Sequence, residues 1–399
     1  MSSDSHSGSG WPQVTYVALA VLVIGLVFLW PYLGGPRSAR RAPDPAEGAH
    51  MLSAADAGRD ALIKAAAEAA QASVTGRWEM IVERARAAAA AGPDRLPVFI
   101  WTLFTAFDAL EAREQEGALR AFFETGRDVR FGEVFTVARG GWLMDWPTLR
   151  VALLDYVSQR RPELARDLAI QVLQARPDEP GEWALAMREL VRGVPLDQWS
   201  SLVRVRLREF IHDRDWSARG SASWMEGFDI LVAAGTAEAL RDLGTISTES
   251  ASRSARFVAF LTADRLVMTA PAACLMTLNR DPSLFSGATG VRAGLFARGD
   301  LRDPTQLAEL VTYFDRGDVG PGERAQFAAA FPQLSSAPTH RLLTEPVVRS
   351  EEEIQQAEAA VCQQIEIWLH ENRFPAWADA FGEIKRRLEA RQPSAAPAS

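Results

Sequence analysis

The residues whose types and spacing come closest to a metal site are His212, Asp213 and Asp215, in the segment IHDRDW at 211–216. Metal-assisted hydrolysis in a helical protein needs further His and Asp ligands from neighbouring helices. No second histidine lies at a suitable distance in the sequence. We therefore expect no metal at this segment. A helix C-terminus, where a protonated imidazole is favoured, accounts better for His212.

The two cysteines are the candidates for nucleophilic chemistry. Cys362 and His370 are eight residues apart, which on one helix is two turns or roughly 12 Å, too far for a direct dyad. Cys274 stands in the apolar run TAPAACLMTL and is typical of a small core residue. The sequence contains no P-loop, dinucleotide-binding glycine motif, nucleophile elbow or zinc-protease motif. We accordingly predict no catalytic residue, no cofactor and no enzymatic activity.

Two groups of residues could form a protein-binding surface. Trp142 and Trp146 follow a Gly-Gly pair in an arginine-containing stretch, and both residue types are common interface anchors. The alternative is that both tryptophans pack in the core at a helix junction. Arg204 and Arg208 lie one helical turn apart and could meet an acidic partner. A solvated face with internal salt bridges is the alternative for these arginines.

The segment from Trp11 to Leu33 is long and apolar enough to span a bilayer, because about 20 apolar residues cross the hydrocarbon core. Aromatic residues that favour the membrane interface flank it on both sides, namely Trp11, Tyr16, Trp30 and Tyr32. A buried core helix would seldom be so uniformly apolar. A cleaved signal peptide would need a basic start, which MSSDSHSGSG lacks. We predict a retained single-pass anchor.

The charges around this segment predict its orientation. Arg37, Arg40 and Arg41 follow it and no basic residue precedes it, which places the C-terminal side in the cytoplasm and the anchor in the cell (inner) membrane. Residues 1–41 carry +2, so the rest of the chain, whose total is −8, carries −10. An acidic domain disfavours binding to nucleic acid. The bilayer and another protein are therefore the expected partners.

Helical periodicity runs through the rest of the chain and predicts an all-α soluble domain, a stack of helices or α-solenoid with irregular repeats. Shared apolar faces are expected for Leu164, Leu168 and Val172, for Val203, Leu207, Phe210 and Ile211, and for Trp377, Phe381, Ile384 and Leu388. Helix starts are expected at the capping box Ser350–Glu353 and at Pro147, Pro162, Pro304 and Pro321. Beyond a disordered start at 1–10 and the anchor at 11–33, we predict a linker at 34–53, an alanine-rich helical stalk at 54–92, a repeat-like domain at 93–333, a linker at 334–349, a helical pair at 350–392 and a disordered tail at 393–399.

Two stretches resemble known helical repeats. Residues 161–190 are similar to a tetratricopeptide repeat, with Tyr156, Ala165 and Pro177 on signature positions. The pattern departs from the family at Leu153 and Trp199, where small residues belong. Residues 295–333 resemble a HEAT-like helix pair. The resemblance implies a superhelical binding scaffold and does not specify a partner.

These observations favour a membrane-anchored helical scaffold or adaptor that binds other proteins. The alternative is a membrane-anchored enzyme or sensor whose ligand pocket is assembled between helices from residues far apart in the sequence.

Overall fold

The computed structural model describes residues 74–92, 95–132, 135–335 and 342–391. The chain divides into two units, Met1–Glu68 and Ala69–Ser399, and the described residues all belong to the second unit. The predicted anchor at 11–33, the linker at 34–53 and the tail at 393–399 lie outside the described residues. Among the helices that are described, none is sufficiently long and apolar to cross a membrane.

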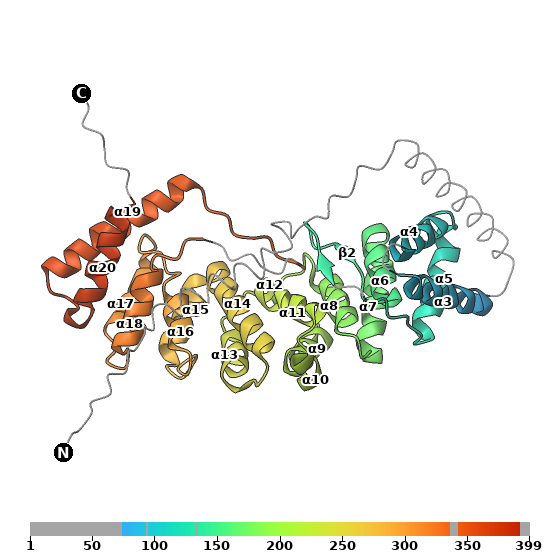
Figure 1. Ribbon diagram of the computed structural model, residues 1–399, viewed down its shortest axis with the longest axis horizontal. Coiled ribbons are helices and arrows are strands. Elements are labelled where there is room, and N and C mark those ends of the chain that lie inside the picture. The colour runs from blue at the N-terminus through green and yellow to red at the C-terminus, as the bar shows by residue number, and fades with distance from the viewer. Residues whose placement is uncertain (1–73, 93–94, 133–134, 336–341, 392–399) are drawn as a thin grey trace, which may run out of the picture. The chain divides into compact units, whose positions relative to one another are not determined.

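The described chain is mostly helical, in agreement with the predicted all-α class (Figure 1). The first part contains α3 (Val74–Ala90), α4 (Arg95–Asp108), α5 (Ala112–Glu124), α6 (Leu149–Arg160), α7 (Pro162–Ala175), α8 (Pro180–Val191), the 3-10 turn η1 (Leu196–Gln198) and α9 (Ser201–His212). The second part contains α10 (Arg214–Arg219), α11 (Ala222–Gly227), α12 (Asp229–Ala234), α13 (Ala239–Glu249), α14 (Arg253–Thr269), α15 (Pro271–Arg280), α16 (Thr289–Phe296), α17 (Pro304–Phe314), α18 (Pro321–Ala330), α19 (Glu351–His370), η2 (Pro375–Trp377) and α20 (Ala378–Glu389).

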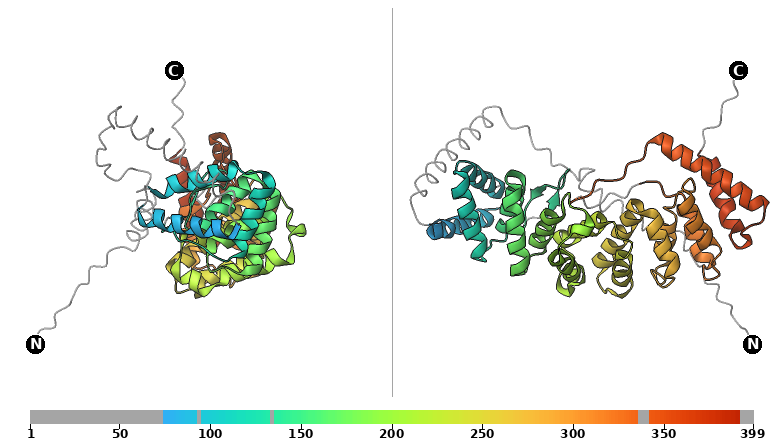
Figure 2. Two further views of the ribbon diagram at one scale, coloured as in Figure 1. Left: turned by 90° about the vertical axis from the view of Figure 1, so that its right-hand side faces the viewer. Right: turned by 180° about the vertical axis from the view of Figure 1, so that it is seen from behind.

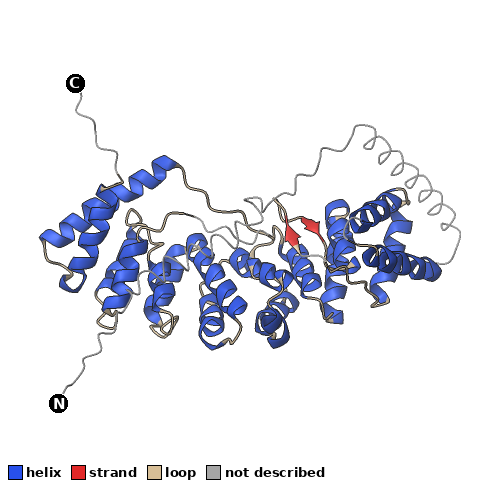
Figure 3. Ribbon diagram, in the orientation of Figure 1, coloured by secondary structure: helices blue, strands red, loops and turns tan. Residues whose placement is uncertain are grey.

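One short hairpin departs from the all-α expectation (Figure 3). Strands β1 (Thr136–Val137) and β2 (Leu143–Asp145) pair antiparallel. Gly140 and Gly141, with φ of 81° and 79°, make the turn between them, a conformation that glycine adopts without steric cost. Strands of two and three residues are too short to show an alternating pattern, so the sequence offered no signal for them.

Helices pack in an alternating order along the chain (Figures 1 and 2). One series of contacts joins α6 to α8, α12 to α14, α14 to α16, α16 to α18 and α18 to α20. A second series joins α5 to α7, α7 to α9, α13 to α15 and α15 to α17. Many helices thus meet the helix two places along the chain, an arrangement compatible with a helical repeat.

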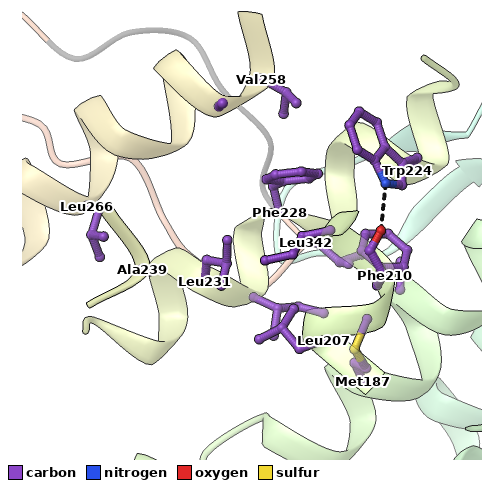
Figure 4. Packing of buried hydrophobic residues seen from close by; sticks show 14 of the residues in the cluster. Met187, Leu207, Phe210, Trp224, Phe228, Leu231, Ala239, Val258, Leu266 and Leu342 are labelled. Carbon is purple, nitrogen blue, oxygen red and sulfur yellow. Dashed lines mark hydrogen bonds between the residues drawn. The ribbon is translucent and has the colours of Figure 1, made fainter. Parts of the chain in front are cut away.

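The predicted apolar faces are confirmed. The residues named for α7, for α9 and for the C-terminal helix with its preceding turn are all buried. Figure 4 shows part of the resulting core, where Phe210, Trp224 and Phe228 lie together and the indole N–H of Trp224 donates to the carbonyl of Phe210 at 2.9 Å. A single hydrophobic cluster runs from Trp78 to Leu388 through the described residues.

Most predicted helix starts are also confirmed. Pro162, Pro304 and Pro321 open α7, α17 and α18, and the capping box of Ser350 and Glu353 opens α19. The prediction for Pro147 is wrong. This proline lies one residue before Thr148, whose side chain caps α6 by accepting from the Val151 N–H.

Within the range predicted as a stalk, the described helix α3 belongs to the helical stack. Its Trp78 is buried, donates to the Ala118 carbonyl at 2.8 Å and stacks on Phe122 of α5 with ring centroids 4.2 Å apart. Large buried aromatic contacts of this kind attach α3 firmly to α5.

Buried ion pairs connect the helices of the first series. Arg150 and Asp155 of α6 pair with Glu182 and Arg188 of α8, Asp229 of α12 pairs with Arg265 of α14, Asp264 of α14 pairs with Arg298 just after α16, and Arg292 of α16 pairs with Glu323 of α18. All of these side chains are at most 8 % exposed. A buried charge persists only when it is paired and hydrogen-bonded, so each pair constrains how two neighbouring helices fit together.

Candidate functional site

The two tryptophans proposed as interface anchors have different environments. Trp146 is buried, its indole N–H donates to Asp155 Oδ2 at 3.3 Å, and its ring meets Phe104 edge-on at 5.7 Å. Its role is therefore in packing, as the alternative interpretation stated. Trp142 is half-buried at the end of the hairpin.

Two arginines of the α8 segment hold Trp142. The guanidinium of Arg188 lies 5.2 Å from the indole centroid and that of Arg192 lies 4.4 Å from it, both within cation–π range. Arg188 is fully buried and donates to Asp155 and to the Gly141 carbonyl. Burial, and then the charge of Arg188, lower the pKa of Arg192. Trp142 thus fastens the hairpin to α8, and only part of its surface remains for a partner.

The two arginines predicted as a binding pair on α9, Arg204 and Arg208, have different environments in the structure. Arg204 donates to the Leu196 carbonyl at 2.7 Å and to the Trp199 carbonyl at 3.2 Å, so it caps the turn η1. Arg208 is exposed and forms no ion pair with any other residue that the structure describes. Val205, between them, is 53 % exposed. Arg204 is also exposed, but its guanidinium is held by these carbonyls, so Val205 and Arg208 are the exposed residues of this surface without such a bond.

The residues considered for metal and nucleophilic chemistry are placed as follows. His212 is the last residue of α9 and lies 3.2 Å from Asp242, while Asp213 caps α10 by accepting from the Trp216 N–H. Cys274 is buried, and burial raises the pKa of its thiol to about 12. The described residues contain no cluster of three or more His, Cys, Asp or Glu side chains arranged for a metal ion.

A buried acidic group lies between α6 and α8. Glu182 accepts from Arg150 Nε at 2.8 Å, and Asp128 accepts from the Arg150 backbone N–H at 3.0 Å. Burial raises the pKa of the Glu182 carboxyl to about 7, the nearby Asp128 and Glu179 add to this rise, and Arg150 opposes it. Each of these carboxyls has a hydrogen-bonding partner, which fits a structural role at the junction of the two helices.

A site that the sequence patterns did not indicate lies on α12 and α14, where Asp229 binds a bend of the same chain at residues 342–344. Asp229 Oδ2 accepts from the backbone N–H groups of Leu343 and Thr344, at 2.6 and 2.8 Å. Its Oδ1 accepts from the Thr344 hydroxyl at 2.6 Å and pairs with Arg265 at 2.7 Å. We call Asp229 and Arg265 the carboxylate clamp.

An apolar site adjoins the carboxylate clamp. Leu342 is fully buried, and Figure 4 shows it beside Phe228 and Leu231, which flank Asp229 and the start of α12. The clamp therefore recognises three consecutive residues, one by an apolar side chain and two through backbone amides. The signal available in the sequence was Asp229 itself, an acid within the apolar stretch FDILVAA, because a buried carboxylate must find donors.

A comparison of the chain with protein families, with curated protein sequences and with solved structures finds no match in any of the three. The class of the protein is therefore that of its fold, an all-α stack of packed helices, and its function must be argued from its own residues.

Proposed function

We propose that this protein is a membrane-anchored helical scaffold that binds other proteins. The observation that carries the proposal is the series of buried arginine–carboxylate pairs between alternate helices. Helices fixed in this way form a framework that can present exposed side chains in constant positions. Preorganised surfaces of stacked helices are typical of proteins that bind other proteins.

The spacing of these pairs supports a repeat of the tetratricopeptide type. Four of the five pairs, those of Glu182, Arg188, Arg298 and Glu323, join residues 32, 33, 34 and 31 positions apart, and the fifth pair, Asp229 with Arg265, is slightly farther apart. A tetratricopeptide repeat has 34 residues, and HEAT or armadillo repeats have about 40–47. Each pair thus joins helices one repeat apart, which favours the shorter repeat.

The membrane part of the proposal rests on the apolar segment 11–33 and on Arg37, Arg40 and Arg41 after it. The helical stack would then be cytoplasmic. Reporter fusions at residue 50 and at the C-terminus test this orientation, and both are expected to report the cytoplasm. A periplasmic or extracellular signal from either fusion would overturn the orientation.

Photo-crosslinking in native membranes tests protein binding directly. A benzoylphenylalanine at Val205, beside the exposed Arg208, is expected to give a small, reproducible set of adducts. The matched control is the same group at Glu163 on α7, whose side chain is 90 % exposed. Adding Arg208→Glu should remove the Val205 adducts. The same adducts at both positions, or adducts that survive Arg208→Glu, would contradict binding at this surface.

A further inference from the structure

We propose that the carboxylate clamp, with the apolar site beside it, is a binding site for a short polypeptide segment that bends as residues 342–344 do, and that Leu342–Thr344 occupy it as an internal ligand. A partner segment with a leucine, any residue except proline, and then a serine or threonine would displace them. This inference rests on the proposed function of protein binding and names the chemistry of the partner.

The hydrogen bonds define what the clamp selects. Two of the three bonds from the segment to Asp229 come from backbone N–H groups, which every residue except proline supplies. The third comes from the Thr344 hydroxyl, which only serine or threonine reproduces without changing charge. Arg265 already neutralises the charge of Asp229. The clamp therefore favours a neutral hydrogen-bond donor over a basic side chain in the ligand.

The apolar site supplies the second requirement. Leu342 is fully buried among residues of the core. Placing a leucine side chain there favours binding by removing its apolar surface from water. A polar residue at this position would lose that gain, so the leucine and the hydroxyl residue together define the ligand.

On its C-terminal side, the internal ligand is followed by a stretch with few contacts. Residues 344–350 form neither helix nor strand, and Val347 and Val348 are 41 % and 81 % exposed. The next ion pair along this segment is that of Arg349, whose guanidinium lies 4.0 Å from Asp300. On the side toward α19, opening of this segment therefore breaks the contacts of Leu342 and Thr344 and few others.

Competition with the internal ligand sets the affinity that a partner needs. A tethered segment acts at an effective concentration of roughly millimolar, so a free peptide with the same contacts binds the wild type weakly. Weakening the internal ligand raises the fraction of vacant clamps, and the apparent affinity of the free peptide rises by the same factor.

The test uses the full-length protein in detergent micelles and a fluorescein-labelled peptide, LLTEPVVRS, which repeats residues 342–350. The variant Leu342→Ser/Thr344→Ala is expected to bind it roughly tenfold or more tightly than wild type by fluorescence anisotropy. Adding Asp229→Ala to this variant should abolish binding. A matched peptide with the same two substitutions should not bind either protein.

A folded double variant, shown by circular dichroism, that binds the peptide no better than wild type would overturn the proposal.

If the double variant does not fold, two further measurements test the same proposal. Thr344→Ala alone leaves Leu342 in place and should still raise the peptide affinity above that of wild type. In wild type, millimolar peptide should speed hydrogen exchange at the amides of Leu343 and Thr344, and unchanged exchange would contradict displacement. Neither of these measurements needs a native membrane or a native partner. A negative result here therefore contradicts the clamp proposal, whereas a negative crosslinking result at Val205 contradicts the proposed protein-binding function.

Discussion

At the scale of single residues, the buried ion pairs carry the clearest stability prediction. Arg292 binds Glu323 through two bonds of 2.8 and 2.5 Å, and Tyr313 donates to the same carboxylate at 2.9 Å. Arg292→Met would leave a buried carboxylate without its cation and is expected to cost about 3–5 kcal/mol. The urea midpoint, followed by circular dichroism, measures the loss.

An exposed pair with the same two-bond geometry provides the control. Arg373 binds Asp315 at 2.8 and 2.7 Å, but both side chains are close to half exposed. Water and salt screen such a pair, so Arg373→Met should hardly change the midpoint. Equal effects of the two substitutions would show that burial does not decide the contribution of these pairs.

The raised pKa of Glu182 predicts a pH dependence. Burial raises the pKa of this carboxyl from 4.5 to about 7, so the folded state binds a proton that the unfolded state has released. The resulting stabilisation is complete below pH 4.5 and is lost as the pH rises through 7. Over this window, wild type should lose roughly 1–3 kcal/mol more than Glu182→Gln.

Unfolding by urea at several pH values between about 4.5 and 7.5 measures this difference. Glu163→Gln, which alters an exposed glutamate, is the control and should follow wild type. Parallel curves for wild type and Glu182→Gln would rule out a titrating carboxyl at this position.

At the scale of the elements, close helix packing predicts opposite effects for two glycines. A Cβ on Gly227 of α11 would lie 2.3 Å from the Phe210 ring, so Gly227→Ala should destabilise the protein by about 1–3 kcal/mol. Gly117 of α5 has open space around it, and Gly117→Ala should stabilise by about 0.5–1 kcal/mol because alanine favours the helix. Thermal unfolding of both variants checks the signs, and a stabilising Gly227→Ala would contradict the packing of α11 on α9.

Sequence periodicity predicted the elements well, because helix faces and caps depend on residues close in the chain. The buried stripe of α7 and the capping box at Ser350 follow from spacings of three and four residues. The carboxylate clamp could not be predicted in this way. Thr344 lies 115 positions from Asp229, and nothing in either local pattern specifies that the two meet.

The candidate binding residues were likewise predicted only as far as local spacing allows. Arg204 and Arg208 share a helical face, as their spacing predicts, but the loop carbonyls that engage Arg204 belong to η1 and its C-terminal cap and could not be assigned from that spacing. Trp142 and Trp146 have the same interpretation from sequence, and only the tertiary structure distinguishes the buried Trp146 from the half-buried Trp142.

At the scale of the whole described unit, stability is expected to depend on neighbouring helices. Helix α16 packs on α14, α17 and α18, and α18 packs on α16, α17 and α20. In such an arrangement, stability is approximately a sum of individual helix terms and nearest-neighbour terms. A local defect should therefore loosen the helices beside it and leave distant ones unchanged.

Hydrogen exchange of the Arg292→Met variant tests this nearest-neighbour behaviour. Amide protection should fall in α16 and α18, which lose their shared ion pair, and fall less in α14 and α20. Protection in α6 and α8 should stay at the wild-type level, because their own pairs, Arg150–Glu182 and Asp155–Arg188, are intact. The reciprocal variant Arg150→Met should loosen α6 and α8 and spare α16 and α18. A uniform loss across all helices in both variants would instead show that the unit unfolds as one cooperative domain, in which the buried pairs act on global stability alone.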